Sequence, residues 1–333
     1  MRGKQILFTD VGKVETLPLD FEEPGELFRD DVLLQTEYTL VSPGTEMDCL
    51  FGRTGGNYPK CLGYSATARV LKCGEEVSEF QAGDRVLVYH SRHASFLVKN
   101  KSDLVKVPEG LAPEEAVFAV VGSMGLQGLR KIRPELGESV MVMGLGLLGM
   151  IASQCAARSG AFPLITLDFN PFRRDLSLQL GADHSFSPDT ADLAEKVKAL
   201  SEGGVPAVVE ATGAPDAINL GLKMMSPLGR IALVGCSRTP TERIDFYQDV
   251  HRPGIQIIGA HNFVRPTDRS RPGYWTMRDD MSALMKLIRA GRINTRKLIT
   301  EIAPPERAPA MYRRFIDKDP GVLGVIFDWR EKE

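Results

Sequence analysis

The sequence predicts an α/β protein in which a doubly wound parallel sheet lies between two β-rich segments. Three observations predict this class. Strands and helices alternate from about residue 113 to about residue 260, a pattern that is typical of parallel sheets. Residues 1–118 consist mostly of short alternating segments that glycine and proline interrupt. The tail returns to a mixture of helices and strands.

Hydrophobic periodicity gives the individual elements. In the first part it predicts strands at 32–39, 66–73 and 85–89, and Pro113 opens a helix in the usual N-terminal manner. For the middle part we expect strands at 140–143, 163–167, 206–210, 230–235 and 254–258, with helices at 147–159, 171–180, 191–201 and 215–225. The tail predicts a helix at 276–290, a strand at 297–302, a helix at 305–317 and a last strand at 322–328.

Composition excludes several classes of protein. The chain has 333 residues, which is long enough for two domains, and its 43% hydrophobic and 25% charged content is that of a soluble globular protein. A net charge of −2 argues against nucleic acid or anionic membranes as partners. The five cysteines are scattered, which argues against a disulfide framework. The N-terminus lacks a long apolar core and no segment approaches about 20 apolar residues, so we expect a cytoplasmic enzyme with no membrane partner.

The most informative motif is Gly-Leu-Gly-Leu-Leu-Gly at residues 144–149. A short apolar run precedes it, a helix follows it, and a second apolar run then ends at Asp168, which is the context that a dinucleotide fingerprint requires. Gly144 permits the tight turn, Gly146 lets a pyrophosphate approach the positive end of the helix, and Gly149 allows close helix packing. Asp168 would accept hydrogen bonds from the adenosine ribose and repel a 2′-phosphate. The motif therefore predicts NAD as cofactor.

Over essentially its whole length, the chain resembles the medium-chain dehydrogenase/reductase superfamily, the alcohol dehydrogenase-like proteins. The residues that carry the resemblance are Gly44-Thr45-Glu46, Gly63, Gly83-Asp84-Arg85-Val86, the glycine motif with Asp168, Glu210-Ala211-Thr212-Gly213, Leu233-Val234-Gly235 and Ile258-Gly259-Ala260. The resemblance implies a GroES-like catalytic domain and a Rossmann domain with a substrate cleft between them. It places the catalytic domain at residues 1–119 and 262–333, and the NAD-binding domain at 120–261. It also implies hydride transfer between a nicotinamide and a carbonyl or alcohol of a small-molecule substrate, and a homodimer or homotetramer.

The chain departs from the zinc-dependent members of this superfamily at each of their three ligand positions. Pro43 stands where those proteins have a cysteine, Gly63-Tyr64-Ser65 replaces their Gly-His-Glu, and the third position falls near Val120. A catalytic zinc needs three protein ligands and an open position. We therefore expect no metal, as in a zinc-lacking branch that the chain resembles more closely.

Without zinc, another group must hold the reacting oxygen. Tyr64 occupies a ligand position, and a phenol can donate to or accept from that oxygen; the alternative is a half-buried aromatic behind the turn. Thr45 matches the hydroxyl that relays protons in zinc-dependent relatives, or it bonds its own turn. His93, with His90 in a loop where relatives place substrate-pocket residues, is a third candidate acid/base, although a histidine in such a loop more commonly faces solvent. Glu46 would orient one of these groups or cap its turn.

The resemblance also implies the remaining contacts to the cofactor. Arg173 is expected at the ribose, and residues 260–262 at the nicotinamide, where the polar His261 and Asn262 suggest a hydroxyl-rich substrate or simply solvate a crossing between domains. An alternative role for Arg173 and Arg174 is to pair with the 2′-phosphate of NADP. The expected cofactor-binding set is Gly144, Gly146, Leu147, Leu148, Gly149, Asp168, Arg173, Ala211, Thr212, Gly213, Val234, Gly235, Ala260, His261 and Asn262.

Three functions compete on this basis. The first is an NAD-dependent, zinc-independent dehydrogenase of a secondary alcohol on a sugar-like or cyclitol substrate. The second is a quinone or enone reductase that uses NADPH, which Asp168 disfavours. The third is a catalytically silent protein that binds a dinucleotide.

Overall fold

The structure, a computed structural model, describes residues 1–236, 238–241 and 243–330. Contacts divide the chain into two compact units. The first unit comprises Met1–Val121 and Met281–Glu333, and the second comprises Gly122–Asp280. Two helices, α3 (Phe118–Ile132) and α8 (Met277–Arg289), run across these boundaries. No helix in the described part of the chain is both long and apolar enough to span a membrane.

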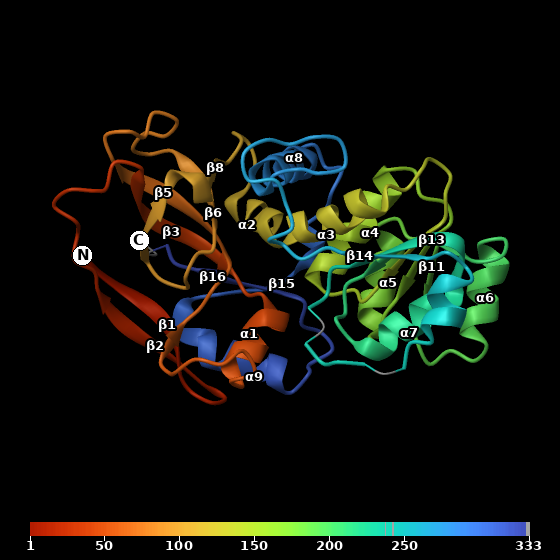
Figure 1. Cartoon of the computed structure of the whole chain (residues 1–333). Coiled ribbons are helices and arrows are strands. Elements are labelled where there is room, and N and C mark those ends of the chain that lie inside the picture. Colours follow the sequence, from red (N-terminus) through yellow and green to blue (C-terminus); the bar gives the residue numbers. More distant parts are fainter. Residues whose placement is uncertain (237, 242, 331–333) are drawn as a thin grey trace. The chain divides into compact units, whose positions relative to one another are not determined.

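The second unit contains a parallel sheet, which has six strands within the described residues (Figure 1). The strands are β9 (Val140–Met143), β10 (Leu164–Leu167), β11 (His184–Phe186), β12 (Val205–Glu210), β13 (Met225–Leu233) and β14 (Gln256–Gly259). Their spatial order, β11-β10-β9-β12-β13-β14, is that of a doubly wound sheet, which reverses direction between β9 and β12. Ligands of such sheets bind at the carboxyl ends of the strands at this switch point.

Four helices connect the strands of this sheet: α4 (Leu147–Arg158), α5 (Pro171–Gln179), α6 (Leu193–Leu200) and α7 (Pro215–Met224). Helix α4 buries most of its residues, because its sequence is apolar on nearly every face. Helix α5 begins where Pro171 occupies the first helical position and the side chain of Asn170 accepts from the N–H of Arg173. A π-helix, η2 (Phe246–His251), precedes β14.

The first unit holds two sheets, which have seven and three strands in the chain as described. The larger contains β3 (Asp31–Leu40), β5 (Ser65–Cys73), β6 (Arg85–Tyr89), β7 (Phe96–Asn100), β8 (Leu104–Lys106), β15 (Ile299–Ala303) and β16 (Gly324–Asp328). The smaller contains β1 (Arg2–Asp10), β2 (Lys13–Asp20) and β4 (Lys60–Cys61). The helices of this unit besides α3 and α8 are α1 (Pro43–Leu50), α2 (Pro113–Ala116) and α9 (Ala308–Ile316), and short 3-10 turns lie at Lys101–Asp103, Arg296–Leu298 and Pro305–Arg307.

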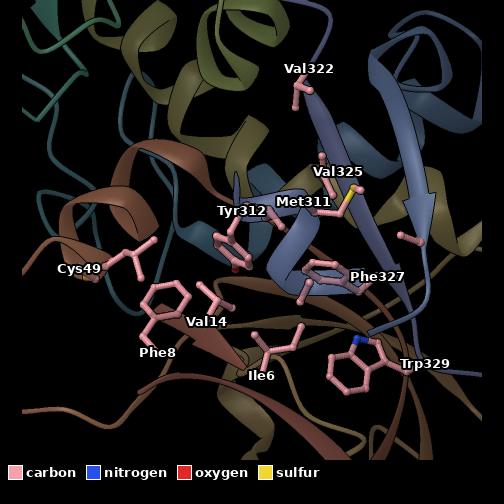
Figure 2. Close-up of a cluster of buried hydrophobic side chains, with 14 residues drawn as sticks. Ile6, Phe8, Val14, Cys49, Met311, Tyr312, Val322, Val325, Phe327 and Trp329 are labelled. Atoms are coloured by element: carbon pink, nitrogen blue, oxygen red, sulfur yellow. The ribbon is translucent and has the colours of Figure 1, made fainter. Parts of the chain in front are cut away.

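The core beneath the smaller sheet joins elements from both ends of the chain. Figure 2 shows Ile6 and Phe8 of β1 beside Tyr312 of α9 and Phe327 of β16. The ring of Tyr312 meets that of Phe8 edge to face, with 5.1 Å between centroids. The N-terminal strands and the C-terminal helix therefore stabilise one another.

The architecture confirms the predicted α/β class with its doubly wound parallel sheet. The predicted helix at Pro113 is two helices, α2 and α3. Strands β1, β2, β4, β8 and β11, helix α1 and the π-helix were not predicted individually. The contacts group residues 262–280 with the second unit, whereas the sequence-based division ends the NAD-binding domain at His261. The grouping has a physical reason, since buried Asp280 accepts from Arg130 Nε of α3 at 2.7 Å.

Candidate active site

The glycine turn lies at the switch point of the parallel sheet. It joins β9 to α4, and Gly144 adopts a φ of +86°, which favours glycine. A Cβ atom on Gly149 would lie 1.8 Å from the carbonyl oxygen of Gly144, so this packing requires glycine. A Cβ atom on Gly146 would meet nothing within 4 Å. The backbone at Gly146 is therefore open to a ligand, while the helix behind it packs tightly.

Helix α4 begins at this open position. Gly146 is its N-cap, and the first N–H groups of a helix have no partner within the helix. Leu147 is buried and Leu148 half-buried, so their side chains face the protein. The positive end of α4 and the open backbone of Gly146 together fit a pyrophosphate.

Asp168 follows β10 directly and holds the glycine turn. Its Oδ2 atom accepts from the backbone N–H of Leu145 at 2.7 Å, and Oδ1 accepts from the N–H of Asn170 at 2.8 Å. The nearest guanidinium nitrogen of Arg173 lies 4.0 Å from Oδ2. Arg174 instead donates to the carbonyl oxygens of Asp168 and Phe169, at 2.9 and 2.8 Å. The carboxylate is fixed by backbone donors, and Arg174 is engaged in holding the turn.

The loops after β12 and β13 pack against the glycine turn. Buried Glu210 accepts from the N–H groups of Thr212 at 2.6 Å and Gly213 at 3.1 Å. Burial raises the pKa of Glu210, although these hydrogen bonds act in the opposite direction. A Cβ atom on Gly144 would lie 2.6 Å from Thr212 Cγ2, and one on Gly235 would lie 2.1 Å from the nitrogen of Gly213. The sequence marked this segment as a motif, but it did not indicate that Glu210 holds it together.

The loop that follows β14 is fixed by its own hydrogen bonds. The N–H of Ala260 donates to Leu233 at 3.0 Å, and Asn262 Oδ1 accepts from Arg265 at 3.2 Å. Nδ1 of His261 accepts from the N–H of Phe263 at 3.2 Å. Because Nδ1 is an acceptor, the proton of a neutral His261 lies on Nε2 and makes it a donor. Val234, also in the expected set, is buried.

In the first unit, Thr45 is exposed in the first turn of α1, and Tyr64 is half-buried just before β5. The Tyr64 ring packs against two others, with centroids 5.7 Å from Tyr89 and 5.2 Å from His90. His90 has a φ of +50°, and its ring lies 3.8 Å from that of Tyr89. Partial desolvation and the charge of Lys99 lower the pKa of His90.

His93 lies in the expected segment between β6 and β7 but is buried instead of facing solvent. It is 1% exposed, its Nδ1 lies 2.7 Å from Thr39 Oγ1, and its Nε2 lies 3.2 Å from Glu46 Oε2. Both ring nitrogens are therefore engaged within the protein, which does not suit a direct acid/base role on a substrate. Glu46 contacts His93, and its Oε1 accepts from the N–H of Ser42, the residue before α1, at 2.7 Å.

The residues at the expected metal positions do not fit zinc. Pro43 and Val120 offer no ligand side chain, and Tyr64 packs among aromatic rings. Among residues whose positions are described, no group of three or more His, Cys, Asp or Glu side chains could hold a metal ion. A tetrahedral zinc site requires at least three such donors.

Similarity to known proteins supports this assignment of the fold. The family described as "Zinc-binding dehydrogenase" matches residues 148–271, which lie within the second unit. D-guloside 3-dehydrogenase of Escherichia coli K12 is 26% identical over 274 residues, covering 80% of this chain and 77% of that protein. L-threonine 3-dehydrogenase of Pyrococcus horikoshii is 28% identical over 320 residues, covering 86% and 87%. The structure of galactitol-1-phosphate dehydrogenase from Escherichia coli superposes with a TM-score of 0.85 at 18% identity, covering 98% and 99%.

These comparisons support the resemblance of the chain to the medium-chain dehydrogenase/reductase superfamily. The similarity to these dehydrogenases identifies the chain as an oxidoreductase that uses a nicotinamide cofactor, NAD or NADP. The superfamily fold combines the β-rich first unit with the parallel sheet of the second. The matched family segment, 148–271, contains none of the positions 43, 64 and 120, so its description carries no information about zinc in this chain.

Proposed function

We propose that this protein is an NAD-dependent, zinc-independent dehydrogenase that interconverts a secondary alcohol and a ketone on a sugar-like or cyclitol substrate. The observation that carries the proposal is the carboxylate of Asp168 beside the glycine turn. Its two oxygens accept from backbone N–H groups, and no guanidinium nitrogen of Arg173 lies closer than 4.0 Å to it. A carboxylate fixed in this way accepts hydrogen bonds from ribose hydroxyls and repels a 2′-phosphate. Arg174 bonds two backbone carbonyls, which argues against its serving a 2′-phosphate.

We assign the remaining cofactor contacts to the loops around the switch point. The open backbone at Gly146 and the first turn of α4, with Leu147 and Leu148, would hold the pyrophosphate. Arg173 would reach the ribose. Loops 211–213, 234–235 and 260–262 lie at the carboxyl ends of β12, β13 and β14, where a doubly wound sheet binds its ligand. The nicotinamide, when bound, supplies the hydride acceptor or donor.

Tyr64 and Thr45 are the proposed proton-handling groups. The Tyr64 hydroxyl donates a proton to the substrate oxygen in the direction of reduction, and its phenolate takes that proton from the alcohol in the direction of oxidation. Thr45, exposed at the start of α1, passes the proton to water. We do not assign His93 this role, because both of its ring nitrogens are already bonded.

A polyol substrate is supported by two observations. The similarity to D-guloside 3-dehydrogenase extends over 80% of this chain. The Nε2–H of His261 is a hydrogen-bond donor beside the loop we assign to the nicotinamide, because Phe263 engages the other ring nitrogen. His261 is exposed, so this N–H is accessible to a hydroxyl group of a substrate.

Three measurements test the proposal on the purified protein. Fluorescence titration with NADH and NADPH should give tighter binding of NADH by at least about tenfold, equivalent to roughly 1.4 kcal/mol. Turnover of NAD is then followed with a panel of polyols, glycosides and cyclitols. Zinc content is measured by elemental analysis, and turnover is measured again after treatment with a chelator.

Preference for NADPH overturns the cofactor assignment. Stoichiometric zinc, together with turnover that the chelator abolishes, overturns the proposed zinc-independent chemistry. Absence of turnover across the panel favours a catalytically silent protein.

A further inference from the structure

The first unit contains a buried chain of polar side chains that we call the Glu46 network: Thr39, Glu46, His93, Tyr312 and Trp329. Glu46 stands at its centre and is 2% exposed. Its Oε2 atom accepts from the hydroxyl of Tyr312 and lies 3.2 Å from His93 Nε2. The network ties α1 to α9, 266 residues later in the chain, and to the segment between β6 and β7.

Donor and acceptor chemistry fixes the direction of the bonds at the two ends of the network. The indole N–H of Trp329 can only donate, and it donates to Thr39 Oγ1 at 2.9 Å. Thr39 Oγ1 also lies 2.7 Å from His93 Nδ1, and the tautomer of His93 decides which of the two atoms donates. The other ring nitrogen of His93, Nε2, contacts Glu46. Burial, and then the charge of Glu46, hold the pKa of Tyr312 well above its ordinary value, so its hydroxyl remains a donor to the carboxylate. Each of these polar groups therefore has a partner.

One end of the network controls the position of Thr45. Thr45 and Glu46 are adjacent in the first turn of α1. Glu46 is bonded to Ser42 twice, since its carboxylate accepts from the Ser42 N–H at 2.7 Å and its own N–H donates to the Ser42 carbonyl at 3.0 Å. The bond to Tyr312 anchors this turn to α9. Thr45 is therefore next to a residue that hydrogen bonds hold to Ser42 and to α9.

The other end controls the position of Tyr64. The backbone N–H of His93 donates to the carbonyl of Leu62 at 2.7 Å. A Cβ atom on Gly63 would lie 2.8 Å from that same nitrogen, so the Leu62–Gly63 turn is in close contact with the backbone of His93. Gly63 also has a φ of +139°, which favours glycine at this position. Tyr64 is the next residue. Because the imidazole of His93 is fixed by Thr39 and Glu46, the turn that carries Tyr64 is fixed with it.

We propose that Glu46 and Tyr312 are positioning residues, which hold Thr45 and Tyr64 in one fixed arrangement through His93. The inference rests on the proposed function, in which those two hydroxyls handle the proton. A phenylalanine at position 312 would fill the same space between Phe8 and Phe327, whose ring centroids lie 5.1 and 6.2 Å from that of Tyr312. Packing therefore does not explain the hydroxyl, whereas a satisfied polar network specifies a single arrangement of the elements it joins.

The test compares Tyr312→Phe with Tyr38→Phe. Tyr38 is also buried in the first unit, on β3, and its ring lies under Arg330 outside the network. For Tyr312→Phe we expect kcat to fall about 10- to 100-fold, the effect of displacing a reacting group by about 1 Å, with KM for NAD unchanged. Hydrogen–deuterium exchange should become faster at residues 43–47 and 62–64. Tyr38→Phe should change neither kcat nor exchange in these segments.

Each outcome decides the inference. A fall in kcat together with faster exchange in both segments supports it. Wild-type kcat in Tyr312→Phe overturns it, even if the free energy of unfolding decreases, because the hydroxyl would then serve stability alone. If Tyr312→Phe does not fold, Glu46→Gln, which keeps the size and one acceptor oxygen, is measured under the same criteria. If the wild-type protein turns over none of the polyols, the proposed function fails, and exchange alone decides: faster exchange at both segments supports positioning, and unchanged exchange overturns it.

Discussion

The carboxylate of Asp168 accepts a hydrogen bond from the backbone N–H of Leu145 at 2.7 Å. Leu145 lies inside the glycine turn and Asp168 follows the next strand of the sheet, so the bond joins the carboxyl ends of β9 and β10. The acid we assign to the ribose thus also shapes the turn we assign to the pyrophosphate. Substituting it should affect both.

We expect Asp168→Asn to raise the Kd for NADH about tenfold or more. Hydrogen bonds to a charged group contribute roughly 1.5–3 kcal/mol, and the amide retains only part of this. Discrimination against NADPH should decrease in the same variant. Asp183→Asn is the matched control, since Asp183 accepts from the N–H of Leu164 at 2.7 Å at the other end of β10. Equal effects of the two substitutions on NADH binding would contradict the assignment.

Gly146→Ala should leave the fold intact and weaken binding of NADH. The methyl group meets no protein atom within 4 Å, and the φ of −66° suits alanine, so the melting temperature should stay close to that of the wild type. The same methyl occupies the space into which a pyrophosphate must approach, so the Kd should rise at least about tenfold, roughly 1.4 kcal/mol. Thermal unfolding and fluorescence titration measure the two effects. Unchanged affinity would mean that the pyrophosphate binds elsewhere.

Gly149→Ala should instead destabilise the second unit. Its Cβ atom would lie 1.8 Å from the carbonyl oxygen of Gly144, and relieving that overlap requires the backbone to shift. Overpacking of this kind costs about 1–3 kcal/mol or more. We expect a lower melting temperature and a lower free energy of unfolding in urea. A melting temperature equal to that of Gly146→Ala would show that the turn and helix are more loosely packed than the structure indicates.

Tyr64→Phe should lower kcat about 100-fold or more, because general acid/base groups contribute roughly 10²–10⁴ to the rate. KM for NAD should be unchanged, since Tyr64 is not among the groups we assign to the cofactor. The aromatic packing against Tyr89 and His90 is preserved in this variant, so a loss of kcat reports on the hydroxyl. Full activity would exclude Tyr64 as the proton donor.

Stability in acid should depend on Glu37 of β3. Burial alone would raise its pKa, but hydrogen bonds and charge from Arg85 and then Arg69 hold the pKa below its ordinary value of 4.5. Because the pKa of Glu37 is lower in the folded than in the unfolded state, its ionised carboxylate stabilises the fold at pH values above the unfolded-state pKa. This stabilisation is lost as the pH falls through the folded-state pKa. Glu37→Gln should therefore lower the free energy of unfolding by about 1–3 kcal/mol at neutral pH, and by progressively less towards about pH 3. Urea unfolding over this range measures the difference, and an equal loss at all pH values would contradict it.

The sequence by itself determined the parts of this protein that depend on neighbouring residues. The strands of the parallel sheet are short apolar runs, and the glycine turn and Asp168 lie within 25 residues of one another, so local backbone chemistry was sufficient to predict them. The alternation of apolar and polar residues is too weak in β1, β2 and β11 to predict these strands, whose pairing is decided by distant partners. The roles of Glu210 and Arg174 became evident only when the loops were folded together.

Only the tertiary structure decided the environment of His93. From the sequence it was a loop histidine near a candidate active site, and nothing local indicated that Glu46, 47 residues before it, and Tyr312, at the other end of the chain, would enclose it. Burial and hydrogen-bond partners are properties of packing, because a side chain meets whichever distant segment the core brings to it. Residue type told us that His93 could exchange a proton, but the core around it shows that both of its nitrogens are already bonded.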